Sequence, residues 1–359
     1  MGTTRPNFYH DEPIFGLDIG NSSLKVMQIE TERGKRPKVT AYGVSEFYPS
    51  DTTQQGVIVK SDILSQSLYD VLKNHLKGAV TTNRVACTIP TAHTFSRLMK
   101  LPALEDEELS EAVHLEVEQY IPMPADKLYV DYEISKRSSD GIEVLMVATP
   151  KNIIDSYVQF LESIDLEPVA LEPSMNAAAR LFSMTNTPHG QPTILVDFGS
   201  VAADVAVIDQ TVFVNSTIPG GSDTLANMIA KKLSVTRPEA MNIKNQIGIN
   251  HSDKQQEIMH VAQPMLDGLV NEVKKVMRYY SERSGQKQTK IDQLVLVGGG
   301  STMPGLSDYL ASALGIQPRV LDPWNKLDFS GLQPLGELEK SMYITVAGEA
   351  ILNPKEIFA

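Results

Sequence analysis

Cysteine is nearly absent from this chain of 359 residues, and long apolar runs are missing altogether. The single thiol, Cys87, can form no internal disulfide and cannot supply a four-thiolate zinc site, so disulfide scaffolds and zinc ribbons are excluded. One isolated cysteine is compatible with a reducing cytosol. No stretch contains 18 consecutive apolar residues, which predicts that no helix spans a bilayer.

Basic residues are also in short supply. The chain has 32 Lys and Arg against 44 Asp and Glu, a formal net charge of −12. A nucleic-acid surface needs clustered Lys and Arg to contact phosphates, so nucleic acid is not expected as a partner. The 42% hydrophobic and 21% charged content is that of an ordinary globular protein. At roughly 150 residues per domain, the length predicts about two domains.

Signals for secretion, membrane anchoring and zinc are missing as well. Residues 1–13 contain no apolar core of a secretory signal, and the final residues, LNPKEIFA, form no basic amphipathic anchor. We therefore expect no direct membrane insertion. The seven histidines are dispersed, with no pair at metal-ligand spacing, so no zinc site is expected.

Two distant segments share one pattern of apolar residues, aspartate and glycine. The first, at residues 14–20, ends in Asp18 and Gly20, and the second ends in Asp197 and Gly199. Each is followed closely by another apolar stretch, which predicts a β-hairpin with the motif at its turn. Glycine lets backbone N–H groups approach an anion, and aspartate offers hard oxygens to Mg²⁺ or its water shell. Two such hairpins facing one another predict a nucleotide clamp, whereas one alone predicts only an ordinary turn.

Two glycine-rich turns follow, each between a predicted strand and a predicted helix. The first holds Gly220 and Gly221, and the second holds three successive glycines after the apolar residues 294–297. Such turns bring backbone close to a flat ligand or a phosphate, but each alone is a weak signal. The order of two hairpins and two glycine turns resembles the actin-like ATPase superfamily. That resemblance implies an α/β, two-lobed fold of the actin-like, ribonuclease H-like type.

Within that superfamily the chain resembles the PilM family of type IV pilus assembly proteins. The resemblance covers about residues 14–353, and it is carried by GLDIGNSSLKVMQIE, EQYIPMP, VATPK, ILVDFG and LVLVGGGSTMPG. It implies an inserted subdomain of the type found in FtsA and PilM. The implied units are a first lobe (14–81 and 169–190), an inserted partner-docking subdomain (82–168), a second lobe (191–233 and 290–359) and a helical subdomain beside the nucleotide (234–289).

Hydrophobic periodicity predicts the order of elements inside the insertion. Strand and helix patterns alternate as two strands and a helix, twice over. The predicted strands are 84–89, 96–101, 129–134 and 143–149, and the predicted helices are 104–120 and 151–164. A further long helix is expected at 258–284.

The resemblance implies ATP with Mg²⁺ as the bound cofactors, held between the lobes. Asp18 and Asp197 are expected to hold Mg²⁺ through water. Lys25 takes the place of a phosphate-contacting lysine, the alternative being a surface strand lysine. Glu172 is expected beside the hydrolytic water, the alternative being an acid favoured by a helix dipole. The other implied nucleotide residues are Gly20, Asn21, Ser22 and Ser23 in the first phosphate loop, Gly199 and Ser200 in the second, and Gly220, Gly221, Lys244, Gly298, Gly299, Gly300 and Met303.

The second phosphate loop departs from relatives that hydrolyse ATP. Ala202 and Ala203 offer no hydroxyl where such relatives often carry one. In the helix that contacts ribose and adenine, Met241 stands where many relatives have glutamate, while the lysine three residues later is retained. Methionine accepts ribose hydrogen bonds only weakly. We therefore expect nucleotide binding with slow or absent turnover.

The resemblance also implies a partner. In PilM-like proteins a groove between the inserted subdomain and the core binds the short N-terminal cytoplasmic tail of PilN, a single-span inner-membrane protein, as an extended peptide. The chain would then lie in the cytoplasm at the inner face of the membrane, held there by its partner, with the pilus motor ATPases left open as further partners. Two alternatives remain, an FtsA-like division or filament-forming protein and a small-molecule phosphotransferase.

Overall fold

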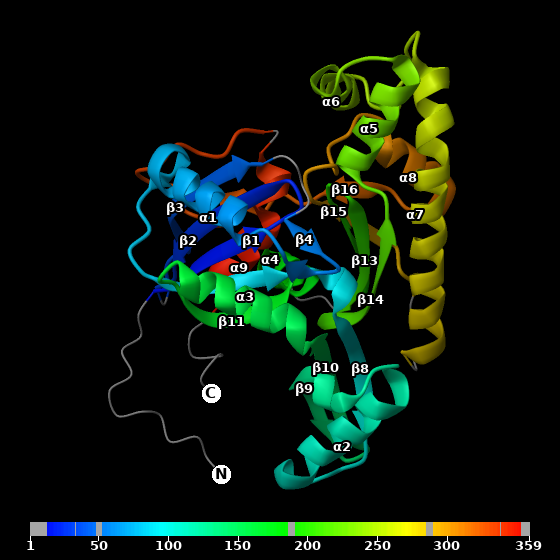
Figure 1. Ribbon diagram of the computed structural model, residues 1–359. Helices are drawn as coiled ribbons and strands as arrows, with labels where there is room; N and C mark the ends of the chain where they lie inside the picture. The colour runs from blue at the N-terminus through cyan, green and yellow to red at the C-terminus, as the bar shows by residue number, and fades with distance from the viewer. Residues whose placement is uncertain are drawn as a thin grey trace.

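The computed structural model describes residues 13–32, 34–47, 52–185, 191–284, 290–337 and 339–352. These residues fold into two α/β lobes with a smaller unit beside them, seen at the bottom of Figure 1. The expectations about a secretory signal and a terminal anchor concern residues at the chain ends that lie outside the described ranges, wholly or in large part.

The first lobe is built on a six-stranded sheet in the order β11-β7-β1-β2-β3-β6. β1 pairs antiparallel with β2, as the predicted hairpin, and parallel with β7. Because side chains alternate along a strand, Phe15 and Leu17 share the face buried under α1 and α3. The bounds are β1 (Phe15–Ile19), β2 (Ser23–Glu30), β3 (Lys38–Glu46), β4 (Thr53–Gln54), β5 (Val57–Ile58), α1 (Ser61–Asp70), β6 (Lys77–Gly78), β7 (Arg84–Ile89), α3 (Lys151–Ser163) and β11 (Glu167–Pro173).

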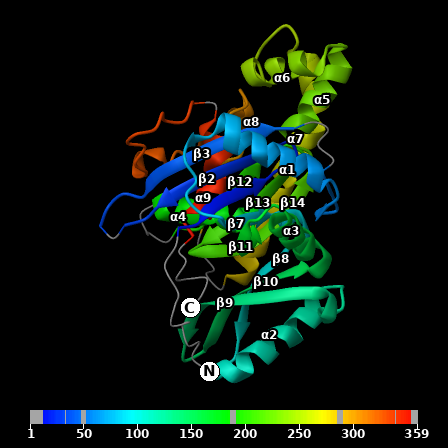
Figure 2. The same ribbon diagram turned by 60° about the vertical axis from the view of Figure 1, so that its left-hand side comes forward.

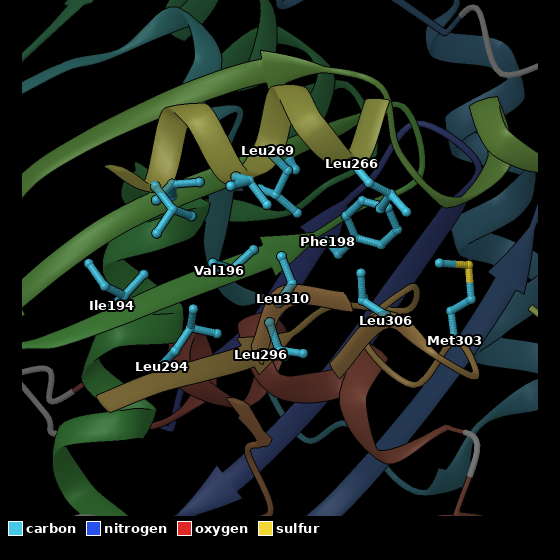
Figure 3. Close-up of a cluster of buried hydrophobic side chains, with 14 of the residues drawn as sticks. Ile194, Val196, Phe198, Leu266, Leu269, Leu294, Leu296, Met303, Leu306 and Leu310 are labelled. Carbon is cyan, nitrogen blue, oxygen red and sulfur yellow. The ribbon is translucent and has the colours of Figure 1, made fainter. Parts of the chain in front are cut away.

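The second lobe carries an eight-stranded sheet in the order β16-β15-β12-β13-β14-β8-β10-β9. β12 and β13 form the second predicted hairpin, and β15 runs parallel to β12. Side chains of β12 and β15 meet those of α7 and α8 in one buried cluster (Figure 3). The bounds are β12 (Thr193–Phe198), β13 (Ala202–Asp209), β14 (Thr211–Pro219), α5 (Ser222–Leu233), α6 (Arg237–Gln246), α7 (Gln255–Arg283), β15 (Gln293–Val297), α8 (Leu306–Leu314) and β16 (Pro318–Val320).

Two helices, α4 (Ser174–Thr185) and α9 (Ile344–Ala350), lie between the sheets. A Cβ on Gly16 of β1 would lie 2.6 Å from the carbonyl oxygen of Val346 in α9, and a Cβ on Gly348 would overlap the backbone of Ala177 in α4. Glycine therefore lets β1, α9 and α4 pack backbone against backbone. α9, which the sequence grouped with the second lobe, also packs on β1, β2 and β7 of the first sheet.

The range 82–168, expected as one inserted subdomain, contains segments that pack in two different hydrophobic clusters. β7 and α3, at its two ends, belong to the core of the first lobe. Between them β8 (Phe95–Leu101), α2 (Asp106–Tyr120), β9 (Leu128–Ser138) and β10 (Gly141–Pro150) enclose a hydrophobic cluster of their own, which forms the small unit of Figures 1 and 2. β8 joins this unit to β14 through a single register pair, Val214 with Arg97.

Candidate functional site

A cleft of about 770 Å³ opens between the two lobes. Its walls come from the turns of both hairpins, the end of β7, the starts of α4 and α5, one face of α6 and the glycine turn after β15. The structure therefore brings together segments that are far apart in the sequence. Residues of the sequence prediction that line the cleft are Asp18, Gly20, Asn21, Ser22, Ser23, Lys25, Asp197, Gly199, Ser200, Lys244, Gly298, Gly299 and Gly300.

In the first hairpin, Asp18 of β1 stands directly opposite Lys25 of β2. The ammonium of Lys25 donates to Oδ2 of Asp18 at 2.8 Å, and the hydroxyl of Thr88 donates to Oδ1 at 2.8 Å. Lys25 is buried, with only 7% of the residue exposed, which rules out the alternative of a surface strand lysine. The turn itself is closed by the Gly20 N–H, which donates to the carbonyl of Ser23 at 2.9 Å.

The second hairpin repeats this geometry with one change of charge. Asp197 of β12 stands opposite Asp204 of β13, and the Gly199 N–H donates to the carbonyl of Ala202 at 3.1 Å. The position that holds Lys25 in the first hairpin therefore holds a carboxylate in the second. The hydroxyl of Thr217 on β14 donates to that Asp204 carboxylate.

Burial raises the proton affinity of the two facing aspartates. Burial raises the pKa of Asp197 to about 7, with further contributions from the charges of Asp204 and Asp18. Burial raises the pKa of Asp204 to about 6 against the opposing effect of its hydrogen bond from Thr217. Within the described residues neither carboxylate forms an ion pair. The charge of Lys25 and a hydrogen bond from Thr345 act in the opposite direction on the pKa of Asp197.

Gly220 and Gly221 brace the second hairpin rather than line the cleft. A Cβ on Gly221 would lie 2.5 Å from the carbonyl oxygen of Gly199. The N–H groups of Ser222 and Asp223, at the start of α5, donate to the carbonyls of Gly199 and Ser200, both at 2.8 Å. These helix-terminal N–H groups are thus engaged by the loop, and Gly220 and Gly221 themselves are not among the residues that line the cleft.

Lys244 reaches the cleft from α6. This helix starts with a capping box in which Thr236 and Glu239 exchange hydrogen bonds. Lys244 is only 3% exposed, and its ammonium donates to the hydroxyl of Ser222. Burial lowers the pKa of this lysine. Met241, the departure from the glutamate of relatives, lines the cleft beside it.

The three glycines after β15 form the wall beside the second hairpin. Gly298 has a φ of +84° and touches Asp197 so closely that a Cβ would overlap its carboxylate, and a Cβ on Gly300 would overlap the ring of Phe198. A residue with a side chain would strain the backbone at the first position and collide with the hairpin at both. Met303, expected beside adenosine, packs instead in the hydrophobic cluster of the second lobe.

Glu172 lies outside the cleft lining. Both of its carboxylate oxygens accept from the guanidinium of Arg180, which also donates to the carbonyl of Gly348 at 2.9 Å. The wholly buried Glu349 lies beside this pair, and burial together with the charge of Glu172 raises the pKa of Glu349 well above its ordinary range. The expected role of Glu172 beside a hydrolytic water therefore gains no geometric support, because its side chain is committed to Arg180.

Sequence reasoning missed several cleft residues. Asp204 could have been found, since it follows Asp197 by the same seven positions that separate Lys25 from Asp18. Thr88 and Thr217 had no such signal, because they lie on separate strands that only the fold brings to the hairpins. Their hydroxyls donate to the carboxylates of Asp18 and Asp204.

A second, smaller groove of about 330 Å³ lies between β8 and β14. Beyond the Val214–Arg97 pair the two strands no longer pair with each other. Residues 94–97 of one segment and 215–217 of the other form the walls of the groove there. Two polar atoms, Oγ of Ser96 and Nδ2 of Asn215, are buried there without a hydrogen-bond partner in the described structure. The groove shares Thr91, Ala92 and Thr217 with the larger cleft, and the exposed Tyr120 stands at its other end, stacked on Arg97.

The described part of the chain holds no ready-made metal cage. No three His, Cys, Asp or Glu side chains gather there at a spacing that could hold a metal ion by themselves. Any metal in the cleft would therefore need ligands beyond the protein's own carboxylates. Nor does any helix in those ranges have the length and apolar character needed to cross a membrane.

Comparison with known proteins gives the chain its family. Residues 16–352 match the family described as type IV pilus assembly protein PilM. The chain belongs to the PilM family. Its role therefore lies in type IV pilus assembly, as the segments quoted from the sequence predicted.

Solved structures agree on the fold. The structure of a "PilM-PilN type IV pilus biogenesis complex" matches with a TM-score of 0.80 at 19% identity, covering 95% of this chain and 98% of that one. MreB5 of Spiroplasma citri bound to AMPPNP matches at 0.54 and 12% identity over 96% of both chains. Ethanolamine utilization protein EutJ from Carboxydothermus hydrogenoformans matches at 0.53 and 17% identity, over 94% of this chain and 88% of that one. The predicted actin-like, two-lobed α/β fold is confirmed.

Proposed function

We propose that this PilM-family chain is a cytoplasmic ATP-binding scaffold that docks the N-terminal cytoplasmic tail of a PilN-like inner-membrane protein. The observation that carries the nucleotide half is the pair of hairpins with identical register, Asp18 with Lys25 and Asp197 with Asp204, on the walls of one cleft. Family membership supports the pilus role, and the similarity to a PilM-PilN complex supports a PilN-like partner.

The residues of the cleft fit a nucleoside triphosphate accompanied by Mg²⁺. Both turns present glycine and serine, the residue types that cradle phosphates with backbone N–H groups and hydroxyls. Lys25 adds one cation, but Asp197 and Asp204 make the opposite wall acidic, so a bare triphosphate would be repelled there. Mg²⁺ supplies the positive charge that lets phosphates and carboxylates share a site. The cleft volume is also typical of small-molecule sites, which run from roughly 300 to 1,000 Å³.

Binding rather than rapid turnover is the proposed role of the nucleotide. Glu172 is held by Arg180 outside the cleft lining, and the second loop contributes no threonine. We therefore propose at most a slow ATPase, in which the bound nucleotide holds one arrangement of the lobes.

We propose that the partner's tail binds in the groove between β8 and β14. An extended peptide satisfies strand edges by adding its own backbone hydrogen bonds, and the two strands that form this groove stop pairing along it. The buried Ser96 hydroxyl and Asn215 amide offer it further hydrogen bonds. Docking there would hold the chain at the inner face of the membrane, with contacts to the motor ATPases as a further part of the proposal.

Isothermal titration calorimetry of the purified chain with Mg–ATP tests the nucleotide half. We expect saturable binding that Asp18→Ala weakens, because Lys25 then loses its partner at the phosphate end. The matched control is Asp292→Asn, an exposed acid outside the cleft, which should bind as the unaltered chain does. Unchanged affinity in Asp18→Ala would contradict this location of the site, and rapid conversion of ATP to ADP would contradict the scaffold role.

The partner half is tested with a synthetic peptide of a PilN-like N-terminal tail and the chain loaded with Mg–ATP. We expect binding that Asn215→Ala and Ser96→Ala each weaken. Asn325→Ala, at an exposed position far from the groove, serves as the control. Capture from detergent-solubilised membranes should retain a small single-span protein; retention of a division GTPase, or of further copies of the bait alone, would contradict the proposal.

A further inference from the structure

We infer that the segment docked in the groove between β8 and β14 carries an acidic side chain, and that Arg97 pairs with its carboxylate and thereby fixes the register of the segment. The inference rests on the proposed docking function and names a chemical feature of the partner. It begins from the lining of the groove. Among the described residues that line it, Arg97 on β8 is the one charged residue.

Arg97 has no anionic partner in the described part of the chain. Its guanidinium lies over the ring of Tyr120, 3.7 Å from the ring centroid, and no ion pair or side-chain hydrogen bond joins it to another described residue. Stacking on a ring leaves the N–H donors at the rim of the guanidinium available, and their fork matches a carboxylate. Because Arg97 is half-buried, an anion that shares its surroundings stabilises its charge. Arg97 is therefore held in place for a carboxylate that the chain itself does not supply.

The other unpaired polar atoms of the groove are also hydrogen-bond donors. Nδ2 of Asn215 can only donate, and Oγ of Ser96 carries a hydroxyl proton; both atoms are buried without a partner in the described structure. Ser96 directly precedes Arg97, and Asn215 directly follows Val214, the residue that pairs with Arg97 across the strands. A ligand that satisfies these neighbouring donors must offer acceptors. An extended peptide with a carboxylate offers them, through that side chain and through its backbone carbonyls.

The charge of the surrounding unit favours one pair at a defined place over a general attraction. Residues 94–150 hold 12 Asp and Glu against five Lys and Arg, so most of this unit repels an acidic segment. An extended segment that slips by one residue turns every side chain to the opposite side. A carboxylate that is accepted only at Arg97 excludes such registers. Because the proposed segment is an N-terminal tail, this carboxylate belongs to an Asp or Glu side chain and not to a chain end.

Calorimetry tests the inference with two synthetic peptides, the PilN-like tail and the same tail with its Asp and Glu residues replaced by Asn and Gln. We expect the amide peptide to bind the unaltered chain about tenfold more weakly. Arg97→Gln should weaken the acidic peptide by a similar factor and leave the amide peptide unaffected, so that the two losses do not add. Arg97→Lys keeps the charge without the planar fork and should recover part of the difference.

The charge-matched control is Lys100→Gln, an exposed position of the same strand outside the groove lining, which should bind both peptides as the unaltered chain does. Tyr120→Ala removes the ring that holds the guanidinium and should reduce the difference between the peptides. Circular dichroism melts confirm that each variant is folded. Equal affinities of the two peptides for the unaltered chain, additive losses, or a tail without an acidic residue would overturn the inference and leave the docking proposal intact.

A probe that does not depend on the tail keeps the inference separate from the docking proposal. Nitrogen-15 NMR of the full chain follows Nε of Arg97, assigned by its loss in Arg97→Lys. The chain is titrated with an acetylated and amidated tetrapeptide that contains one Glu, and with its Gln counterpart. We expect the Nε resonance to shift with the Glu peptide alone. If the tail fails to bind but this difference appears, the docking proposal fails and the carboxylate pairing stands. Equal shifts with the two peptides, or no shift with either, would refute the pairing.

Discussion

The protonation of a buried carboxylate depends in part on the group that faces it, and the two hairpins demonstrate this at the scale of single residues. Asp18 meets a lysine and forms a buried ion pair, whereas Asp197 meets a second aspartate, and burial together with that aspartate's charge raises the pKa of Asp197 to about 7. The Asp-x-Gly pattern could be predicted from the sequence because a turn needs both residue types locally. The pairing of Glu172 with Arg180 could not, because it depends on how a strand and the following helix pack against each other.

Glu349→Gln should stabilise the chain increasingly as pH rises. Burial and the charge of Glu172 raise the pKa of Glu349 well above 4.5, so the folded chain keeps this proton to a higher pH than the unfolded chain does. Its contribution to stability is therefore lost progressively as pH rises from about 4.5 through the folded pKa. Glutamine keeps the volume of the side chain and cannot ionise.

The measurement is the free energy of unfolding in denaturant at a series of pH values. The exposed Glu162→Gln is the control and should show no such trend. A gain in Glu349→Gln that stays constant with pH would contradict the argument, because it would mean that Glu349 titrates alike in the folded and unfolded chains.

At the scale of elements, hydrophobic periodicity predicted each helix and strand of the inserted region to within a few residues, because each buries a face of its own. Which other helices and strands those elements pack against was less predictable. β8 belongs by its core to the small unit, yet it pairs with β14, more than a hundred residues later, through one position. β7 and α3 were grouped with the insertion by their order in the chain, and their packing joins them to the first sheet.

Gly348→Ala should destabilise the fold. An added Cβ would overlap the backbone of Ala177, and neither α9 nor α4 can move without disturbing the sheets on either side. We expect a loss of at least about 2 kcal/mol, since overpacking of this kind outweighs the helix-propensity gain of roughly 0.5–1 kcal/mol.

The matched comparison is Gly268→Ala in α7, where a Cβ would meet nothing within 4 Å. There the propensity gain acts alone, so this variant should be more stable than the unaltered chain by up to about 1 kcal/mol. Thermal and chemical unfolding of both variants provide the test. Equal effects of the two substitutions would show that α4 and α9 are not locked together.

At the scale of the whole molecule, the cleft and the groove are adjacent rather than independent. They share Thr91, Ala92 and Thr217, and Thr217 also donates to Asp204 on the cleft wall. The family and the two-lobed fold could be predicted from the sequence, because ordered local motifs carry them. The adjacency could not, because it arises from the way β14 passes between the two sites.

Mg–ATP and the tail peptide should therefore change each other's affinity. Saturating one site and titrating the other by calorimetry should give the same factor in both directions, as linkage requires. Thr217→Val, which keeps the shape of the side chain and removes the hydrogen bond to Asp204, should bring that factor closer to one. Coupling that is unchanged in Thr217→Val would exclude this side chain as the connection, and Asn325→Ala should leave it intact.

The eight-stranded sheet is continuous in its strand order, but the number of paired residues differs greatly from one pair of neighbouring strands to the next. β9 and β10 are joined along their whole length, from Gly141 with Ser138 to Pro150 with Leu128, whereas β8 and β14 share only the rung at Arg97. Hydrogen bonds loaded together resist force better than one loaded alone. If a membrane protein pulls on the small unit, β8 should separate from β14 at this one pair before any other strands separate. The small unit would then rotate about its chain connections to β7 and α3 without unfolding.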